Sequence, residues 1–509
     1  MDVPAGEILV GAADDGAPVT LRLDRANRHG LVAGATGTGK TVTLQRLAEA
    51  FSAAGAAVFA ADVKGDLSGI ALPAAPSDKL LSRAAELGVE LKPQAAPAMF
   101  WDLFGEAGHP VRATVSELGP VLLARLLDLT DVQAGVLNVV FAVCDKEGLL
   151  LLDLDDLQAA LAYVGEHSKE IGRQYGAVAP SSVAAIQRAL LGMRTQGAQH
   201  LFGEPALKLR DLMRTDTDGR GFVSVLAADK LVGSPGLYAV FLLWLMSELF
   251  EELPEVGDPE RPKLVFFFDE AHLLFRDAPK PLLEKVEQVV RLIRSKGVGI
   301  YFVTQNPQDV PETVLAQLGT RVQHALRAYT PSEQKALKAA AQSFRADPAF
   351  DSAEAIQALG VGEALVSSLD AKGAPTVVRR TRVAPPNSRI GPASPEERAR
   401  VMAGSPVAGD YDTAVNRESA FEILHARAEQ ATAGAQAPPV RTPTAPAPAA
   451  APAPAGGGGF ALPPGLEKIG SGMLTSAMRA ASSSMGRQIA NQVGREILRG
   501  VFGNLSRRR

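Results

Sequence analysis

Residues 34–41 read Gly-Ala-Thr-Gly-Thr-Gly-Lys-Thr, which matches the G-x-x-x-x-G-K-[ST] pattern of a phosphate-binding loop, the Walker A motif. The apolar stretch Gly30–Ala33 before it predicts a strand, and Thr41–Phe51 after it predicts a helix. In this order the glycines let successive backbone N–H groups face a phosphate, and the helix N-terminus adds partial positive charge. The sequence therefore predicts a nucleotide-phosphate site at this loop.

The residues of the loop differ in what they contribute. Lys40 is predicted to reach the β- and γ-phosphates of ATP, and the Thr41 hydroxyl is predicted to bind Mg²⁺. The remaining positions act through their backbone N–H groups. The residues predicted to bind the nucleotide are Gly34, Ala35, Thr36, Gly37, Thr38, Gly39, Lys40 and Thr41.

A second motif lies at the end of the apolar stretch Lys263–Phe268, which predicts a buried strand followed by Asp269 and Glu270. Adjacent carboxylates at a strand end suit a Walker B arrangement, in which Asp269 binds Mg²⁺ together with Thr41 and Glu270 polarises the attacking water. Glu270 therefore makes hydrolysis the expected reaction, beyond nucleotide binding alone. For His272, a role in coupling the site to another element and a structural role both stay open.

Another predicted strand, Gly299–Thr304, ends in Gln305 and Asn306. Ligands of open α/β sheets bind outside the carboxyl ends of the strands, so Gln305 is predicted to sense the γ-phosphate. Thr304 and Asn306 either assist it or cap the strand. The turn 62–66, Asp-Val-Lys-Gly-Asp, ends a further predicted strand at the same edge. Whether it contacts nucleotide, polynucleotide or a neighbour, or is an ordinary polar turn, stays open.

An arginine that stabilises the transition state of phosphoryl transfer is commonly supplied across a subunit boundary. Arg291 and Arg321 are the candidates for this finger, with Arg294 and Arg327 as further choices. For each of them a surface ion pair is the competing interpretation.

From residue 1 to about 390, short apolar stretches alternate with helical ones, which is typical of an α/β fold with a mainly parallel sheet. Predicted strands are Gly30–Ala33, Ala57–Asp62, Gly221–Ala227, Lys263–Phe268 and Gly299–Thr304, and predicted helices include Ser116–Leu127, Asp131–Cys144, Asp153–Tyr163 and Ser181–Met193. We expect residues 1–115 and 213–390 to form the two parts of a P-loop ATPase core, 116–212 a helical insertion, 391–430 a peripheral segment, 431–464 a disordered Pro/Ala/Gly-rich linker and 465–509 a basic amphipathic tail.

Composition limits the remaining choices. The 509 residues are 46% apolar and 21% charged, which excludes wholesale disorder, and a net charge of −4 excludes a global cationic surface that would coat DNA or membranes. The one cysteine, Cys144, excludes an internal disulfide framework and is expected in the core. The N-terminus lacks a secretory signal pattern and Leu237–Met246 is too short to span a bilayer, so we expect a cytoplasmic protein.

The tail 465–509 carries arginines and lysine in excess over Glu467 and Glu496. Its apolar positions Ile489, Val493, Ile497 and Val501 recur every four residues, which predicts a basic amphipathic helix. Docking of this helix on the core or on another subunit, contact with nucleic acid, and contact with a lipid surface all stay open.

With the phosphate loop, Asp269-Glu270, the 304–306 strand end and the 62–66 turn in order, the chain resembles the HerA/FtsK superfamily of P-loop motor ATPases. It looks most like the helicase HerA-like C-terminal domain proteins, which residues 28–41 and 318–327 also fit. The resemblance covers roughly residues 5–390 and extends to the tail. It implies a RecA-like core, a homo-oligomeric ring, expected to be a hexamer, and ATP-driven movement of DNA by a helicase or translocase.

One feature departs from that family. HerA helicases carry a barrel domain before the phosphate loop, whereas 33 residues precede Gly34 here, so we expect no barrel or only a strand pair such as Ile8–Val10 and Val19–Leu23. The barrel is associated with nuclease pairing, and a nuclease partner therefore stays open.

Other functions compete with a DNA motor. Residues 269–272, Asp-Glu-Ala-His, also spell the box of DEAH helicases, but too few residues follow Thr304 for the second RecA-like domain of that class. A P-loop ATPase that acts on protein, and a nucleotide-gated scaffold that contacts a membrane surface through the tail, are the remaining alternatives.

Overall fold

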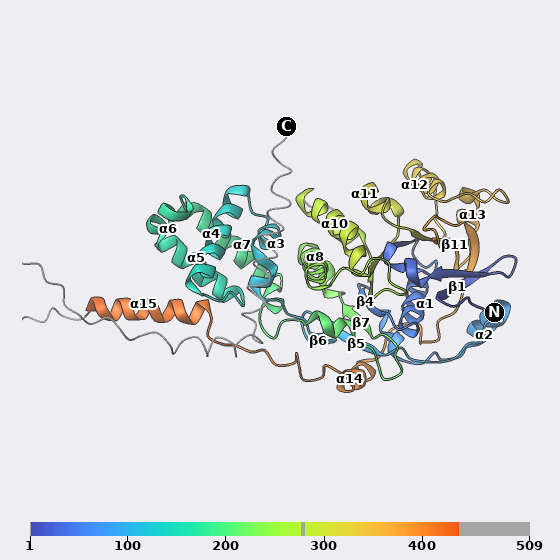
Figure 1. Ribbon diagram of the computed structural model, residues 1–509, viewed down its shortest axis with the longest axis horizontal. Coiled ribbons are helices and arrows are strands. Elements are labelled where there is room, and N and C mark those ends of the chain that lie inside the picture. Colours follow the sequence, from blue (N-terminus) through green and yellow to red (C-terminus); the bar gives the residue numbers. More distant parts are fainter. Residues whose placement is uncertain (1, 276–279, 437–509) are drawn as a thin grey trace, which may run out of the picture. The chain divides into compact units, whose positions relative to one another are not determined.

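The computed structural model describes residues 2–275 and 280–436 (Figure 1). Residues Met1–Ala428 form one compact unit, and the second unit, Glu429–Arg509, is described only to the end of helix α15 at Gln436. The predicted tail and all but the first positions of the predicted linker lie outside the described residues. Those first positions, 431–436, continue α15, because the run Ala-Thr-Ala-Gly-Ala-Gln contains no proline.

A single twelve-stranded sheet organises the first unit. In spatial order its strands are β2 (Pro18–Arg22), β1 (Glu7–Ala13), β12 (Arg379–Val383), β11 (Glu363–Ser367), β10 (Thr320–Gln323), β3 (Gly30–Ala33), β9 (Val298–Thr304), β8 (Leu264–Phe268), β4 (Ala57–Asp62), β7 (Val223–Ala227), β5 (Ala98–Asp102) and β6 (His109–Pro110).

Strand direction divides the sheet into two regions. From β10 through β6 every neighbouring pair is parallel, and the pairs among β2, β1, β12, β11 and β10 are antiparallel. The prediction of a mainly parallel α/β fold is therefore confirmed. The strand pair expected near the N-terminus forms β1 and β2, which extend the antiparallel end of the sheet.

The five predicted strands are present as β3, β4, β7, β8 and β9, since their long apolar runs are buried on both faces. The sequence analysis did not identify β5, β6, β10, β11 and β12 as strands. In β12 the sequence Arg-Arg-Thr-Arg-Val buries only Thr381 and Val383. Such a strand carries too few apolar residues to stand out from a loop.

Helices cover both faces of the sheet (Figure 1). Helix α1 (Lys40–Ala53) packs on one face, where Phe51 lies 6.3 Å from the ring of Phe267 and 5.8 Å from that of Tyr301. Helices α8 (Pro235–Glu252) and α10 (Lys280–Ile293) belong to the core on the other face, with Phe266 and Phe268 of β8. Alternate residues of β8 thus join opposite cores and fix this strand in the sheet.

Five helices follow one another between β6 and β7. They are α3 (Val115–Leu126), α4 (Asp131–Glu147), α5 (Leu154–Glu166), α6 (Ser168–Tyr175) and α7 (Pro180–Thr195). Capping boxes at Thr114, Thr130 and Asp153 start the first, second and third of them. Four of the helices were predicted, and α6, which buries none of its residues, was not. Cys144 lies in their core, as predicted, and is 1% exposed.

The remaining helices are short or peripheral: α2 (Asp78–Glu86), α9 (His272–Phe275), α11 (Glu312–Leu315), α12 (Pro331–Gln342), α13 (Ser352–Ala358), α14 (Pro395–Ala403) and α15 (Ala420–Gln436). None of the described helices is both long and apolar enough to cross a membrane. Helix α8 is strongly apolar because residues 237–246 are all buried in the core.

The central position of β8 leads to a prediction about stability. Replacing the fully buried Phe267 by Ala removes its ring contacts with Phe51 and Tyr301 and leaves a cavity. We expect the free energy of unfolding, measured by guanidinium titration, to fall by about 3–5 kcal/mol. Leu191, which is 65% exposed, provides the control. The substitution Leu191→Ala should change the free energy of unfolding by less than about 0.5 kcal/mol. Equal midpoints for both variants would contradict this packing.

Candidate functional site

The predicted site residues follow neighbouring parallel strands. Ala33 of β3 pairs with Thr304 of β9, Phe268 of β8 pairs with Phe302 of β9, and β4 lies next to β8. The segments that follow these strands therefore leave the sheet at one edge. The phosphate loop, the Asp269-Glu270 pair, Gln305 and the 62–66 turn all begin there.

The glycines of the phosphate loop are required by its shape. Gly37 and Gly39 have φ values of 78° and 111°, in the region that disfavours side chains. A Cβ on Gly34 would lie 2.5 Å from the Cβ of His324, and one on Gly39 would lie 3.2 Å from the Cα of Gly362. The backbone can form this tight curve only because glycine occupies these positions.

Neighbouring segments hold the loop in place from behind. The N–H groups of Gly34 and Ala35 donate to the carbonyls of Thr304 at 3.2 Å and Ala325 at 2.8 Å. The N–H of Gly362 donates to the carbonyl of Thr38 at 2.9 Å. The loop is therefore attached to the ends of β9, β10 and β11 before any ligand contributes.

His324 connects this support to helix α1. Its Nδ1 lies 2.8 Å from the carbonyl of Glu363 and its Nε2 lies 2.9 Å from Oγ1 of Thr43. Because a carbonyl only accepts, Nδ1 carries the proton and Nε2 accepts from the hydroxyl. Burial lowers the pKa of His324 to about 4. The sequence analysis did not single out His324, since β10 has no apolar periodicity that would have placed it beside the loop.

Lys40 is buried, and its Nζ donates to the carbonyls of Gly34 at 2.7 Å and Ala35 at 3.1 Å. Burial, and then the nearby charge of Lys64, lower the pKa of Lys40. The ammonium group therefore lies under the phosphate loop that it is predicted to serve.

Asp269 and Glu270 are 6% and 5% exposed. Burial raises the pKa of Asp269 to about 7, while Lys64 opposes this shift. For Glu270 the bond and charge of Lys64, together with Gln305 and His272, outweigh burial, so its pKa is lowered. Glu270 has φ of 49°, a left-handed conformation that is uncommon for a residue other than glycine.

Gln305 joins the phosphate loop to Glu270. Its Oε1 accepts from the hydroxyl of Thr36 at 3.3 Å, and its Nε2 lies 3.4 Å from both carboxylate oxygens of Glu270. Thr304 donates to Asp309 at 2.5 Å, and Asn306 caps the turn that follows by accepting from the N–H of Gln308. Of the two interpretations of Thr304 and Asn306, the structure therefore favours capping.

The 62–66 turn reaches Glu270. Nζ of Lys64 lies 2.6 Å from Oε1 of Glu270, and Nδ1 of His272 lies 3.2 Å from Oε2. Sequence reasoning had left the partner of this turn open. The polar residues at this strand end indicated that the turn lies at the sheet edge, but they could not identify the residue that the turn contacts.

The arginine candidates differ in their surroundings. Arg291 is exposed on α10, and Arg294 and Arg327 are exposed as well. Arg321 in β10 pairs with Leu31, two residues before the end of β3, and donates to the carbonyl of Leu315 at 3.2 Å. Burial lowers its pKa. Neither Arg291 nor Arg321 has a hydrogen bond or ion pair to the loop within the described part of the chain.

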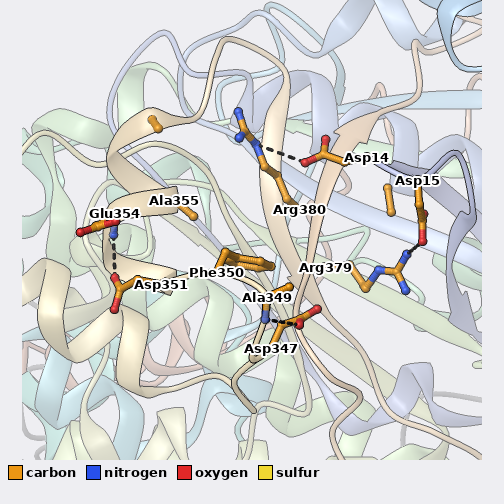
Figure 2. A pocket seen from close by; sticks show the side chains of 12 residues that line it. Asp14, Asp15, Asp347, Ala349, Phe350, Asp351, Glu354, Ala355, Arg379 and Arg380 are labelled. Carbon is orange, nitrogen blue, oxygen red and sulfur yellow. Dashed lines mark hydrogen bonds and ion pairs between the residues drawn. The ribbon is translucent and has the colours of Figure 1, made fainter.

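A pocket of about 840 Å³ lies elsewhere on the first unit, between the β1–β2 turn, β12 and α13 (Figure 2). Asp14 and Asp15 face Arg380 and Arg379 there, and Asp347 and other carboxylates accept from local backbone N–H groups. None of the predicted site residues lines this pocket, so it is separate from the phosphate loop.

The residues at the sheet edge fit a Mg²⁺-nucleotide. A Cβ placed on Gly37 would meet no atom within 4 Å, so this side of the loop is open, and the ammonium group of Lys40 donates to the carbonyls of Gly34 and Ala35. Thr41 and Asp269 offer hard oxygen donors of the kind that Mg²⁺ prefers, with phosphate oxygens and water completing its shell. Within residues 2–275 and 280–436, no group of three or more His, Cys, Asp or Glu side chains could hold a metal by itself.

This sheet has a glycine-rich phosphate loop between β3 and helix α1, and a carboxylate pair after β8, which is separated from β3 by β9. These features define a P-loop ATPase. A family model described as "Helicase HerA-like C-terminal" matches residues 7–509. The chain therefore belongs to the HerA-like C-terminal family, as its motifs predicted.

One named protein is similar over part of the chain. The "Probable helicase MJECL08" of Methanocaldococcus jannaschii is 30% identical over 125 residues, which are 24% of this chain and 22% of that protein. The match thus spans about a fifth of that relative.

Solved structures of similar fold include the conjugative coupling protein TrwB, in unbound form and with the ATP analogue ADPNP. Each has a TM-score of 0.50 and covers 76% of this chain and 91% of that chain, at 16% and 17% identity. VirB4 of Thermoanaerobacter pseudethanolicus has a TM-score of 0.48 at 16% identity and covers 78% of this chain and 99% of that chain. The likeness to TrwB shows a shared RecA-like fold.

The buried His324 predicts a pH dependence of stability. A histidine in the unfolded chain titrates near pH 6.5, and His324 in the folded chain near 4. The contribution of the neutral ring is therefore complete above about pH 6.5 and is lost as the pH falls toward 4. We expect the difference in unfolding free energy between wild type and His324→Gln to shrink by about 2–3 kcal/mol from pH 7.5 to 4.5.

Guanidinium titrations at several pH values measure this difference. His200→Gln, at an exposed position, is the control for the replacement of a histidine by glutamine. A constant difference for His324→Gln over the same range would show that the ring does not stay neutral.

Proposed function

We propose that this chain is a Mg²⁺-dependent ATPase of the HerA/FtsK type that forms a homo-oligomeric ring, expected to be a hexamer, and translocates DNA. The observation that carries the proposal is the chain of contacts from Thr36 of the phosphate loop through Gln305 to Glu270. It connects the position expected for the γ-phosphate with a carboxylate that can activate water. Nucleotide binding alone would not require this connection.

In the proposed reaction, the backbone of residues 34–41 and Nζ of Lys40 bind the phosphates of ATP. Lys40 reaches them by leaving the carbonyls of Gly34 and Ala35. Glu270 accepts the proton of the attacking water, and Gln305 orients that water. A Mg²⁺ held by Thr41 and Asp269 would neutralise charge on the phosphate oxygens.

The content of one chain supports the proposed ring. The described residues contain one RecA-like sheet with one phosphate loop, and within them neither Arg291 nor Arg321 has a hydrogen bond or ion pair to that loop. A neighbouring subunit would therefore supply the finger, from Arg291 or Arg321. The family's helicase description, the name "Probable helicase" of its relative and the ATP-analogue complex of TrwB support ATP as the nucleotide and a nucleic acid, here proposed to be DNA, as the track.

Two substitutions test the catalytic assignment. Lys40→Ala removes the phosphate-binding cation and should lower the steady-state rate of ATP hydrolysis by more than about 100-fold. Glu270→Gln keeps the shape of the side chain but removes the base, so the rate should fall by about 10²–10⁴-fold. The Glu270→Gln protein should still bind a fluorescent ATP analogue, measured by anisotropy. Wild-type turnover by either variant would contradict the assignment.

The DNA track is tested by the same assay with single- and double-stranded DNA. We expect DNA to stimulate hydrolysis at 50 mM salt and to stimulate it less at 200 mM, because phosphate contacts weaken as counterions compete. Lys40→Ala protein gives the background rate. Robust turnover that neither DNA changes would retain the ATPase and favour a protein substrate in place of DNA.

A further inference from the structure

The proposed base of the reaction has a cationic partner on a different strand. Lys64, in the turn after β4, places Nζ 2.6 Å from Oε1 of Glu270, which follows β8. The Glu270 side chain is 7% exposed and that of Lys64 is 34% exposed. We propose that Lys64 is a positioning residue, which fixes the orientation of the Glu270 carboxylate for attack on ATP. This inference rests on the proposed ATPase function.

The turn that carries Lys64 has a fixed shape. The carboxylate of Asp62, 2% exposed, accepts from the N–H of Gly65 at 2.8 Å and of Leu67 at 3.0 Å. Gly65 has φ of 74°, which suits glycine at this position. Strands β4 and β8 are hydrogen-bonded neighbours with Ala61 opposite Phe268, so Lys64 and Glu270 start from adjacent strand ends. The backbone therefore brings Lys64 and Glu270 to adjacent strand ends, within reach of each other's side chains.

The positive charge of Lys64 matters because it lies beside two buried carboxylates. Asp269 and Glu270 are two adjacent buried carboxylates, and Lys64 lies within ion-pair distance of Glu270. Lys40 donates to loop carbonyls, so it does not take the place of Lys64. A buried carboxylate that loses its cation is costly and turns toward water when it can.

The other contacts of Glu270 are weaker and point to the same role. His272 lies 3.2 Å from Oε2, and Gln305 lies 3.4 Å from both oxygens. The left-handed backbone at Glu270, with φ of 49°, is a conformation that persists only where the surroundings hold it. Lys64 therefore supplies the shortest contact that keeps the carboxylate next to Gln305 and the phosphate loop.

The test is Lys64→Met, which keeps the length of the side chain and removes its charge. We expect kcat for ATP to fall by about 10- to 100-fold, as for a misplaced catalytic group, while KM stays within about 2-fold. Lys64→Arg retains a cation and should recover most of the loss. Lys92→Met, at a lysine whose side chain is 70% exposed, is the matched control and should leave both constants unchanged.

Two further readouts separate positioning from folding or binding. Mant-ADP and mant-ATPγS should bind Lys64→Met with wild-type affinity, which also shows that the variant is folded. In single-turnover assays, Lys64→Met should have no further effect once Glu270 is already Gln, because Lys64 acts through that carboxylate.

The outcomes distinguish this inference from the proposed function. An unchanged or increased kcat in Lys64→Met, a selective loss of mant-ATPγS affinity, or an equal loss of rate in the Glu270→Gln background would overturn the role of Lys64 and leave the ATPase intact. Absence of turnover in wild-type protein would overturn the proposed function and this inference together.

Discussion

The hydrogen bonds that attach the phosphate loop to neighbouring strand ends are the constraint on which the site depends. Gly34 donates to Thr304 at the end of β9, and Ala35 donates to Ala325 just after β10. The loop therefore cannot move independently of the sheet. Helix α1 begins at Lys40, at the end of this loop, and buried His324 links the helix to Glu363, the first residue of β11. These contacts fix the phosphate loop relative to the strand ends at this edge of the sheet.

Because the loop is attached to the sheet, the residues that follow the parallel strands lie at fixed positions relative to it. The Asp269-Glu270 pair follows the end of β8, Gln305 follows the end of β9, and Lys64 lies in the turn after β4. These strands are buried on both faces by the cores around α1 and α8, so their ends have little freedom to move. The same packing that stabilises the fold holds the base, the γ-phosphate sensor and their cation within hydrogen-bonding reach of one another.

The sequence predicted most of the long buried strands and the terminal pair β1–β2, but it missed the buried β5 and the strands β6, β10, β11 and β12. β3, β4, β8 and β9 are mostly apolar because helices cover both of their faces, whereas β12 buries only alternate residues and β10 contains Arg321 and Gln323. Site residues that belong to a local motif, such as Lys40 and Glu270, could be named in advance. The support from His324 could not, because it comes from a strand without a recognisable pattern.

The sequence by itself determined the α/β class, the phosphate loop, the carboxylate pair and the family, because each of these depends on short local patterns and on their order along the chain. The tertiary structure decided which of the residues at the sheet edge touch one another. Lys64 and Glu270 are separated by about 200 residues in sequence and meet only because β4 and β8 are neighbours in the sheet. Strand order is set by packing over the whole core, and no local pattern of residues encodes it.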